Sequence, residues 1–137
     1  MDSCLLDTHV WIWLINGDSS LKKKSLDVIT AASRRGRVYV SVISVWEVAM
    51  LVSKGRLLLE KPLQQWCLEA LGAPGIQVQL LTPDIAIESC VLPGPFHGDP
   101  ADRMIVATAR LKNTTIITRD ARILNYGKKG YIKTLAC

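Results

Sequence analysis

The sequence of 137 residues contains only four cysteines, two histidines and one phenylalanine. The four cysteines lie far apart and form no CxxC pair, so the sequence indicates neither a zinc site nor a disulfide framework. We expect Cys4, Cys67, Cys90 and Cys137 to be reduced thiols that mostly fill the core.

Long apolar runs are also missing. The stretch CLLDTHVWIWLI is too short for a transmembrane helix and contains Asp7 and His9. It lacks the positively charged region that begins a secretory signal. We therefore expect a cytoplasmic protein that does not associate with membranes.

What the chain does contain is typical of a globular protein, with 49% apolar and 21% charged residues. Its length predicts a single domain over residues 1–137 with a sizeable core. The formal net charge is +5. A basic protein of this kind suits a polyanionic partner, although charge alone is weak evidence.

Strand-like and helix-like segments alternate along the chain. Strands are expected at residues 3–7, 37–42, 76–80, 114–118 and 131–135. Helices are expected at 9–15, 21–35, 44–54, 61–71 and 100–112, with short ones starting at 83 and 121. Thr8 is expected to cap the first helix and Ser44 to begin the third. This alternation predicts an α/β fold with a mostly parallel sheet covered on both faces.

Acidic residues stand in apolar surroundings at the ends of these segments. The stretch HGDPADRMIVATA places Asp99 and Asp102 at the start of a helix whose remaining turns are almost wholly apolar. Asp7 follows the first strand, Glu47 lies on an apolar helix, and Asp120 follows the fourth strand. Ligands bind beyond the carboxyl ends of parallel strands, so these acids are expected to meet there.

Each acid also has a purely structural interpretation. Ser44 and Glu47 fit a capping box, and Asp99 before Pro100 fits an N-cap. Asp102 can favour the helix dipole, and Asp120 can cap the last helix. Asp7 has the weakest structural explanation. The combination of these acids at strand ends and helix starts is more informative than any one of them.

Four motifs together carry a family resemblance. LLDTHVWIW, SVISVWEVAML, HGDPADRMIVATA and IITRD occur in an order that resembles the PIN-domain family, and within it the VapC-type toxin ribonucleases. The resemblance covers nearly the whole chain. It implies a three-layer α/β/α fold with a five-stranded sheet in the order 3-2-1-4-5. It maps an acidic quartet onto Asp7, Glu47, Asp102 and Asp120.

The same resemblance implies further site residues. It makes Thr118 a hydroxyl residue that can hold a water or a phosphate oxygen, and Asp99 an acid of less certain role. Carboxylates without cysteine or paired histidine select Mg²⁺ or Mn²⁺. We expect Asp7 and Asp102 to be direct ligands, with Asp120 and Glu47 completing the shell. An ion held there can activate water for RNA cleavage.

Basic residues lie beside these acids. Arg103 and Arg119 can anchor phosphate, but a solvated arginine is as good an interpretation. His9 and His97 are expected to be capping or loop residues.

Two other function classes share features with this sequence. A haloacid-dehalogenase-like phosphatase needs a second acid two residues after the first, where this chain has His9. A non-catalytic RNA-binding or interaction module fits the basic clusters at 22–24, 34–37 and 128–133, but it would not need acids in apolar stripes. A housekeeping RNA-processing nuclease is a further alternative to a toxin.

Protein partners are indicated by the aromatic residues. Trp11 and Trp13 lie two positions apart on one short helix and cannot face the same core. The family resemblance implies a homodimer and a cognate antitoxin. We expect the antitoxin to bind beside the helices that carry Trp13 and Met50 and to insert a cation near Asp7 and Asp102.

Overall fold

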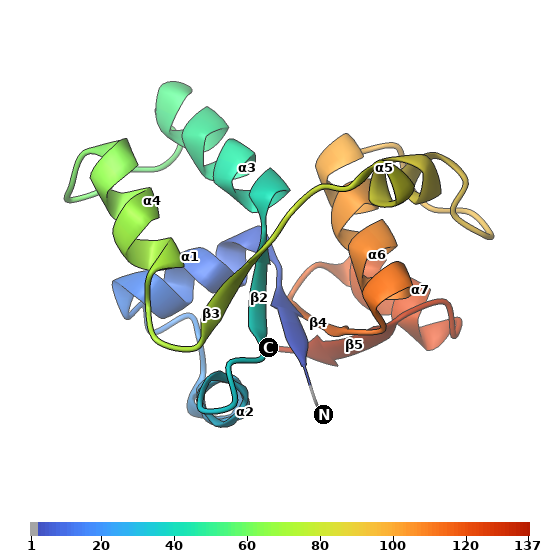
Figure 1. The fold of residues 1–137 in the computed structure, drawn as a ribbon, viewed down its shortest axis with the longest axis horizontal. Coiled ribbons are helices and arrows are strands. Elements are labelled where there is room, and N and C mark those ends of the chain that lie inside the picture. Colours follow the sequence, from blue (N-terminus) through green and yellow to red (C-terminus); the bar gives the residue numbers. More distant parts are fainter. Residues whose placement is uncertain (1–2) are drawn as a thin grey trace.

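The computed structural model describes residues 3–137 as one central sheet with helices on both of its faces (Figure 1). The strands are β1 (Cys4–Leu6), β2 (Val38–Ser41), β3 (Ile76–Gln79), β4 (Thr115–Thr118) and β5 (Lys133–Ala136). The helices are α1 (Thr8–Asn16), α2 (Lys23–Ser33), α3 (Val42–Ser53), α4 (Leu63–Leu71), α5 (Pro83–Cys90), α6 (Pro100–Lys112) and α7 (Ala121–Lys128).

The sheet has the strand order β3-β2-β1-β4-β5, and every pairing is parallel. This confirms the predicted α/β class and strand order. The pairing of Leu6 with Ile117 places the carboxyl ends of β1 and β4 beside each other. Chain segments that follow β1 and β4 therefore emerge at the same edge of the sheet.

Successive side chains of β1 point to opposite faces of the sheet, and each face has its own core. Cys4 and Leu6 face a core shared with α1, α2, α3 and α4, whereas Leu5 faces a core shared with α5, α6 and α7. Figure 1 shows the two helical layers on opposite sides of the strands. All three β1 side chains have no solvent exposure, as expected for a central parallel strand. The expected three-layer arrangement is confirmed.

Four helix starts differ from the predicted ones: α2 and α4 begin two residues later than expected, at Lys23 and Leu63, and α1 and α3 begin earlier because other residues cap them. Asp7, not Thr8, is the N-cap of α1, because its side chain accepts a hydrogen bond from the Thr8 amide. Ser41, not Ser44, caps α3 by accepting a bond from the Ile43 amide at 3.1 Å. The earlier start leaves Ser44 inside α3. The predicted Ser44–Glu47 capping box is therefore wrong.

The remaining sequence expectations had mixed outcomes. Trp11 is buried and packs edge-on against Trp66 with ring centroids 5.0 Å apart, whereas Trp13 is half-buried. The prediction that the two rings cannot face the same core is wrong, because Trp13 packs against the core that contains Trp11. Cys4 is fully buried and the half-buried Cys67 and Cys137 pack against the same core, so the expectation that the cysteines mostly fill the core is confirmed, with the exposed Cys90 as the exception. Within residues 3–137, no helix has the length and apolarity needed to cross a membrane.

Candidate metal and active site

Asp7 lies at the junction of β1 and α1, with 8% of its surface exposed. Its Oδ1 accepts from the Thr8 amide at 2.8 Å, and its Oδ2 accepts from the Thr118 hydroxyl at 2.6 Å. The position after β1 therefore gives Asp7 a structural role that sequence reasoning did not find. Capping one helix does not require burial, however, and the side chain also borders a cavity.

Glu47 is joined to the start of α1 through Thr8. The Thr8 hydroxyl donates to Glu47 Oε1 at 2.5 Å and lies 2.8 Å from the Ser44 hydroxyl. Because α3 begins at Val42, Glu47 lies in its second turn rather than at its start. The contact with Thr8 brings this carboxylate toward Asp7 at the carboxyl edge of the sheet.

The start of α6 holds Asp99 and Asp102. Asp99 caps the helix, since its Oδ1 accepts from the Asp102 amide at 3.1 Å. Oδ2 of Asp102 lies 3.1 Å from Nε2 of His97, and 17% of the Asp102 side chain is exposed. The loop that precedes α6 thus places the His97 ring against the Asp102 carboxylate, although the buried Nε2 has no hydrogen-bond partner in this geometry.

Thr118 ends β4, and Asp120 follows two residues later. The buried Thr118 hydroxyl donates to Asp7 and accepts from the Asp120 amide at 2.9 Å. Asp120 caps α7 by accepting from the Arg122 and Ile123 amides. Thr118 therefore fixes the relative position of the two acids that follow β1 and β4.

These acids share one cavity of about 590 Å³. Its walls are formed by Asp7, His9, Trp13, Glu47, Asp99, Asp102, Arg119, Asp120, Ala121 and Arg122. The structure thus brings together all five predicted acids from four separate segments of the chain. Thr118 lies behind Asp7 and is not part of the cavity wall.

The cavity repels additional negative charge. Burial, followed by the charges of Asp7, Asp99, Asp120 and Glu47, raises the pKa of Asp102 to about 7. Burial also raises the pKa of Asp7 and of Glu47, and hydrogen bonds from Thr118 and Thr8 oppose these shifts. Clustered carboxylates with raised pKa values are stabilised in their charged form by a nearby cation.

The donor set suits a hard divalent cation, but the side chains do not form a ready coordination shell. Among residues 3–137, no group of three or more His, Cys, Asp or Glu is arranged to hold a metal ion. Oxygens of Asp7, Glu47 and Asp99 are engaged in hydrogen bonds instead. The fit to Mg²⁺ or Mn²⁺ therefore rests on carboxylate chemistry and mutual repulsion.

The predicted arginines have different surroundings. Arg103 lies outside the cavity wall and donates to the backbone carbonyls of Ser89, Phe96 and His97 at 2.7–3.1 Å. It is neither solvated nor directed at the acids, and it fixes the loop that carries His97. Arg119 also donates to backbone carbonyls, those of Ser20 and Cys137, but it lies in the cavity wall with its guanidinium 4.5 Å from the Trp13 ring centroid.

Three residues of the site were missed or given a lesser role by sequence reasoning. His9, expected as a capping or loop residue, lies in α1 and lines the cavity. Arg122 lines the cavity, and its Nη1 lies 3.3 Å from Nδ1 of His97. A signal was present, because a cationic side chain in the first turn of α7 opposes the helix dipole. His97 was expected only as a loop residue, and no sequence pattern indicates its contact with Asp102.

Several known proteins resemble this chain in sequence or in fold. A model of the PIN domain matches residues 4–129. Ribonuclease VapC22 of Mycobacterium tuberculosis is 32% identical over 126 residues, covering 92% of this chain and 93% of its own. VapBC2 of Rickettsia felis bound to promoter DNA has a TM-score of 0.71 at 15% identity, covering 97% of both chains. A toxin–antitoxin complex of Klebsiella pneumoniae has a TM-score of 0.65 at 20% identity, covering 97% of this chain and 96% of its own. This chain belongs to the PIN-domain family.

Proposed function

We propose that this protein is an Mg²⁺- or Mn²⁺-dependent endoribonuclease. The observation that carries the proposal is the gathering of five carboxylates around one cavity in a protein whose net charge is +5. The similarity to a ribonuclease along almost the whole chain supports RNA as the substrate.

Asp7 and Asp102 are the residues proposed to hold the cation directly, with Glu47 and Asp120 completing its surroundings. When bound, such an ion supplies activated water and neutralises charge on the leaving oxygen of a phosphodiester. Thr118 holds Asp7 in place through the 2.6 Å hydrogen bond. Arg119 and Arg122 place positive charge in the wall of the same cavity, where they can bind the RNA phosphates.

We further propose that the protein is the toxin of a toxin–antitoxin pair. Structural neighbours that are toxin–antitoxin complexes support this proposal. An antitoxin would insert an Arg or Lys near Asp7 and Asp102 and pack against α1 and α3. Half-buried Trp13 and Met50 offer apolar contacts on those helices.

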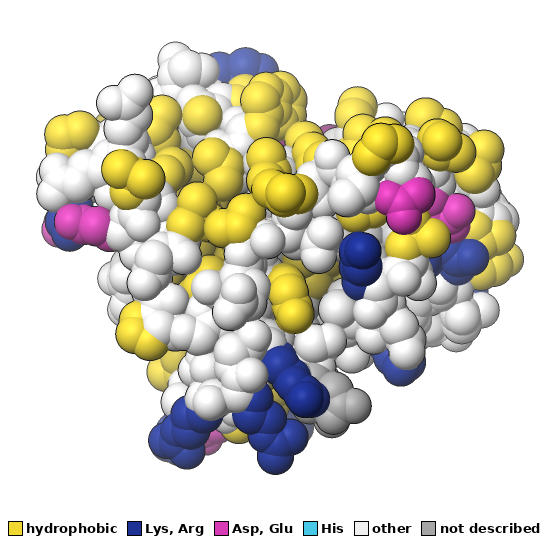
Figure 2. All heavy atoms as spheres, in the orientation of Figure 1, with side chains coloured by type: hydrophobic (Ala, Val, Ile, Leu, Met, Phe, Trp, Pro, Cys, Tyr) yellow, Lys and Arg dark blue, Asp and Glu magenta, His cyan; other side chains and the backbone are white. Residues whose placement is uncertain are grey.

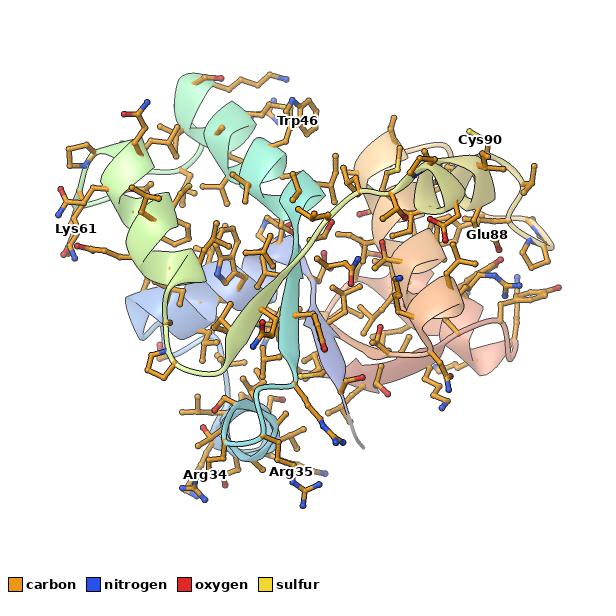
Figure 3. The ribbon with its side chains drawn as sticks, in the orientation of Figure 1. Arg34, Arg35, Trp46, Lys61, Glu88 and Cys90 are labelled. Atoms are coloured by element: carbon orange, nitrogen blue, oxygen red, sulfur yellow. The ribbon has the colours of Figure 1, made fainter. Side chains whose placement is uncertain are left out.

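A homodimer is the second proposed assembly. Figure 2 shows hydrophobic side chains gathered over the half of this face that carries α3, α4 and α5. Exposed members include Trp46, Leu80, Ile87 and Val91. Trp46 projects from α3 on the side that faces α5 in this view (Figure 3). Gathered exposed apolar side chains are typical of a protein interface.

Cleavage of a mixed RNA pool tests the nuclease proposal. The wild type is compared with Asp7→Asn and with Asp84→Asn, a control that removes an exposed acid outside the cavity. We expect the wild type and Asp84→Asn to cleave RNA when Mg²⁺ is present and to lose this cleavage when EDTA removes the metal. Asp7→Asn should fold, as circular dichroism would verify, but should not cleave. RNA binding without cleavage under all conditions would instead support a non-catalytic RNA-binding module.

A further inference from the structure

A second, smaller pocket adjoins the acidic cavity. It has a volume of about 160 Å³ and is lined by Pro95, Phe96, His97, Arg122, Asn125, Tyr126 and Lys129. Arg122 lines both the acidic cavity and the smaller pocket, so it lies at the boundary between them. None of the five acids of the cavity lines the smaller pocket. Its chemistry consequently differs from that of the neighbouring site.

The pocket combines an apolar wall with a polar rim. The half-buried Phe96 ring packs against Tyr126 and His97 with centroids 4.9 Å and 4.5 Å apart. The exposed Asn125 and Lys129 come from α7 and the residue that follows it. An aromatic wall beside an amide that both donates and accepts hydrogen bonds suits an unstacked nucleobase.

Arg122 has the character of a phosphate ligand. Within residues 3–137 its guanidinium contacts His97 Nδ1 at 3.3 Å and forms no ion pair with a carboxylate. Its place in the first turn of α7 gains nothing from the helix dipole. Its planar guanidinium is therefore available to bind an anion that lies between the acidic cavity and the smaller pocket. Lys129 provides a second positive charge among the residues that line the pocket.

We propose that this pocket is a nucleotide subsite for single-stranded RNA, next to the scissile phosphate. The base lies against Phe96, and its polar edge meets the Asn125 amide. Arg122 donates to the phosphate that links this nucleotide to the acidic cavity. This subsite rests on the proposed nuclease function. It adds a path for the RNA chain, which runs from the acidic cavity past Arg122 and along α7.

Binding without cleavage separates base contacts from phosphate contacts. The parent protein carries Asp7→Asn, so that the RNA stays intact. Two fluorescent probes of equal length are used, an oligouridylate and an abasic ribose-phosphate oligomer, and fluorescence anisotropy reports their affinities. We expect the parent to prefer oligouridylate about tenfold, the size expected when one base stacks on an aromatic ring.

Variants in the parent background assign this preference to the pocket. Phe96→Leu and the exposed Asn125→Ala should each lose most of the preference for oligouridylate. Arg122→Gln should weaken both probes equally and reduce the salt dependence of binding by about one phosphate contact. Arg35→Gln is the charge-matched control, since Arg35 lies just after α2 and points away from the rest of the molecule (Figure 3). It should leave the preference unchanged.

Several results would overturn the subsite. These are equal affinity of the parent for the two probes, an unchanged preference in Asn125→Ala, or equal weakening by Arg35→Gln and Arg122→Gln. If the wild type still cleaves RNA in these cases, only the subsite is lost. Failure of both probes to bind, together with no RNA cleavage by the wild type, would overturn the nuclease function and the subsite with it.

Discussion

Nε2 of His97 lies 3.1 Å from Oδ2 of Asp102, so a loop residue is in contact with one of the proposed metal ligands. On the other side of the ring, Nδ1 faces the Asp99 amide at 3.4 Å and the Arg122 guanidinium at 3.3 Å. Because these two groups are N–H donors, Nδ1 is the accepting nitrogen of the ring, and Nε2 is the nitrogen that faces Asp102. His97 therefore contacts the Asp102 carboxylate without lining the acidic cavity.

Two substitutions separate the two sides of the His97 ring. His97→Gln keeps an N–H near Nε2, whereas His97→Asn keeps an acceptor near Nδ1. We expect His97→Asn to lose about tenfold in Mn²⁺ affinity and in RNA cleavage, and His97→Gln to lose much less. The opposite order would show that His97 serves only to hold the loop.

The Asp102 carboxyl makes stability depend on pH. Its pKa is about 7 in the folded protein, compared with 3.8 for an unperturbed aspartic acid. The metal-free folded state therefore binds this proton more tightly, and its stability falls as the pH rises from about 4 to about 7. Asp102→Asn should flatten this decline and raise the free energy of unfolding at about pH 8 by about 1–2 kcal/mol. Urea unfolding without metal at several pH values measures the difference, and a parallel pH dependence in the two proteins would contradict it.

Asp99 should matter less to catalysis than Asp102. Its side chain caps α6, and serine can replace it in that role. We expect Asp99→Ser to keep much of the RNA cleavage activity and Asp99→Ala to lose about 1 kcal/mol of stability. Asp102→Asn should remove activity. Equal losses in Asp99→Ser and Asp102→Asn would place Asp99 among the metal ligands.

Expression in a host cell tests the toxin proposal separately from the chemistry. The wild type should arrest growth, and Asp7→Asn at the same protein level should not. If the wild type is harmless while the purified protein cleaves RNA, the toxin proposal fails. A housekeeping RNA-processing role would then be favoured.

The layers of the fold and the grouping of the acids at one edge of the sheet could be predicted from the sequence. Buried strands appear as short apolar runs, and the residues that follow them mark the carboxyl edge of the sheet. Leu5, between Cys4 and Leu6, could be assigned to a fully buried strand in this way. Helix starts were harder, because Ser41 and Ser44 are both acceptable caps and only tertiary contacts distinguish them. In the fold, Ser44 lies beside the Thr8 hydroxyl instead.

Long-range side-chain contacts left no sequence signal. Arg103 follows Asp102 and was considered as a phosphate ligand, yet it binds carbonyls of a loop that only the folded chain brings near. The hydrogen bond from Thr118 to Asp7 joins residues 111 positions apart. Such contacts depend on the strand order, which came from the family resemblance rather than from the residues themselves.

Calorimetric titration of Mn²⁺ into the metal-free protein tests most directly whether the acidic cavity holds a divalent cation. We expect saturable binding by the wild type and by the control Asp84→Asn, competition by Mg²⁺, and loss of binding in Asp7→Asn and Asp102→Asn. Absence of binding to the folded wild type, or equal affinity in all four proteins, would contradict the proposed metal site.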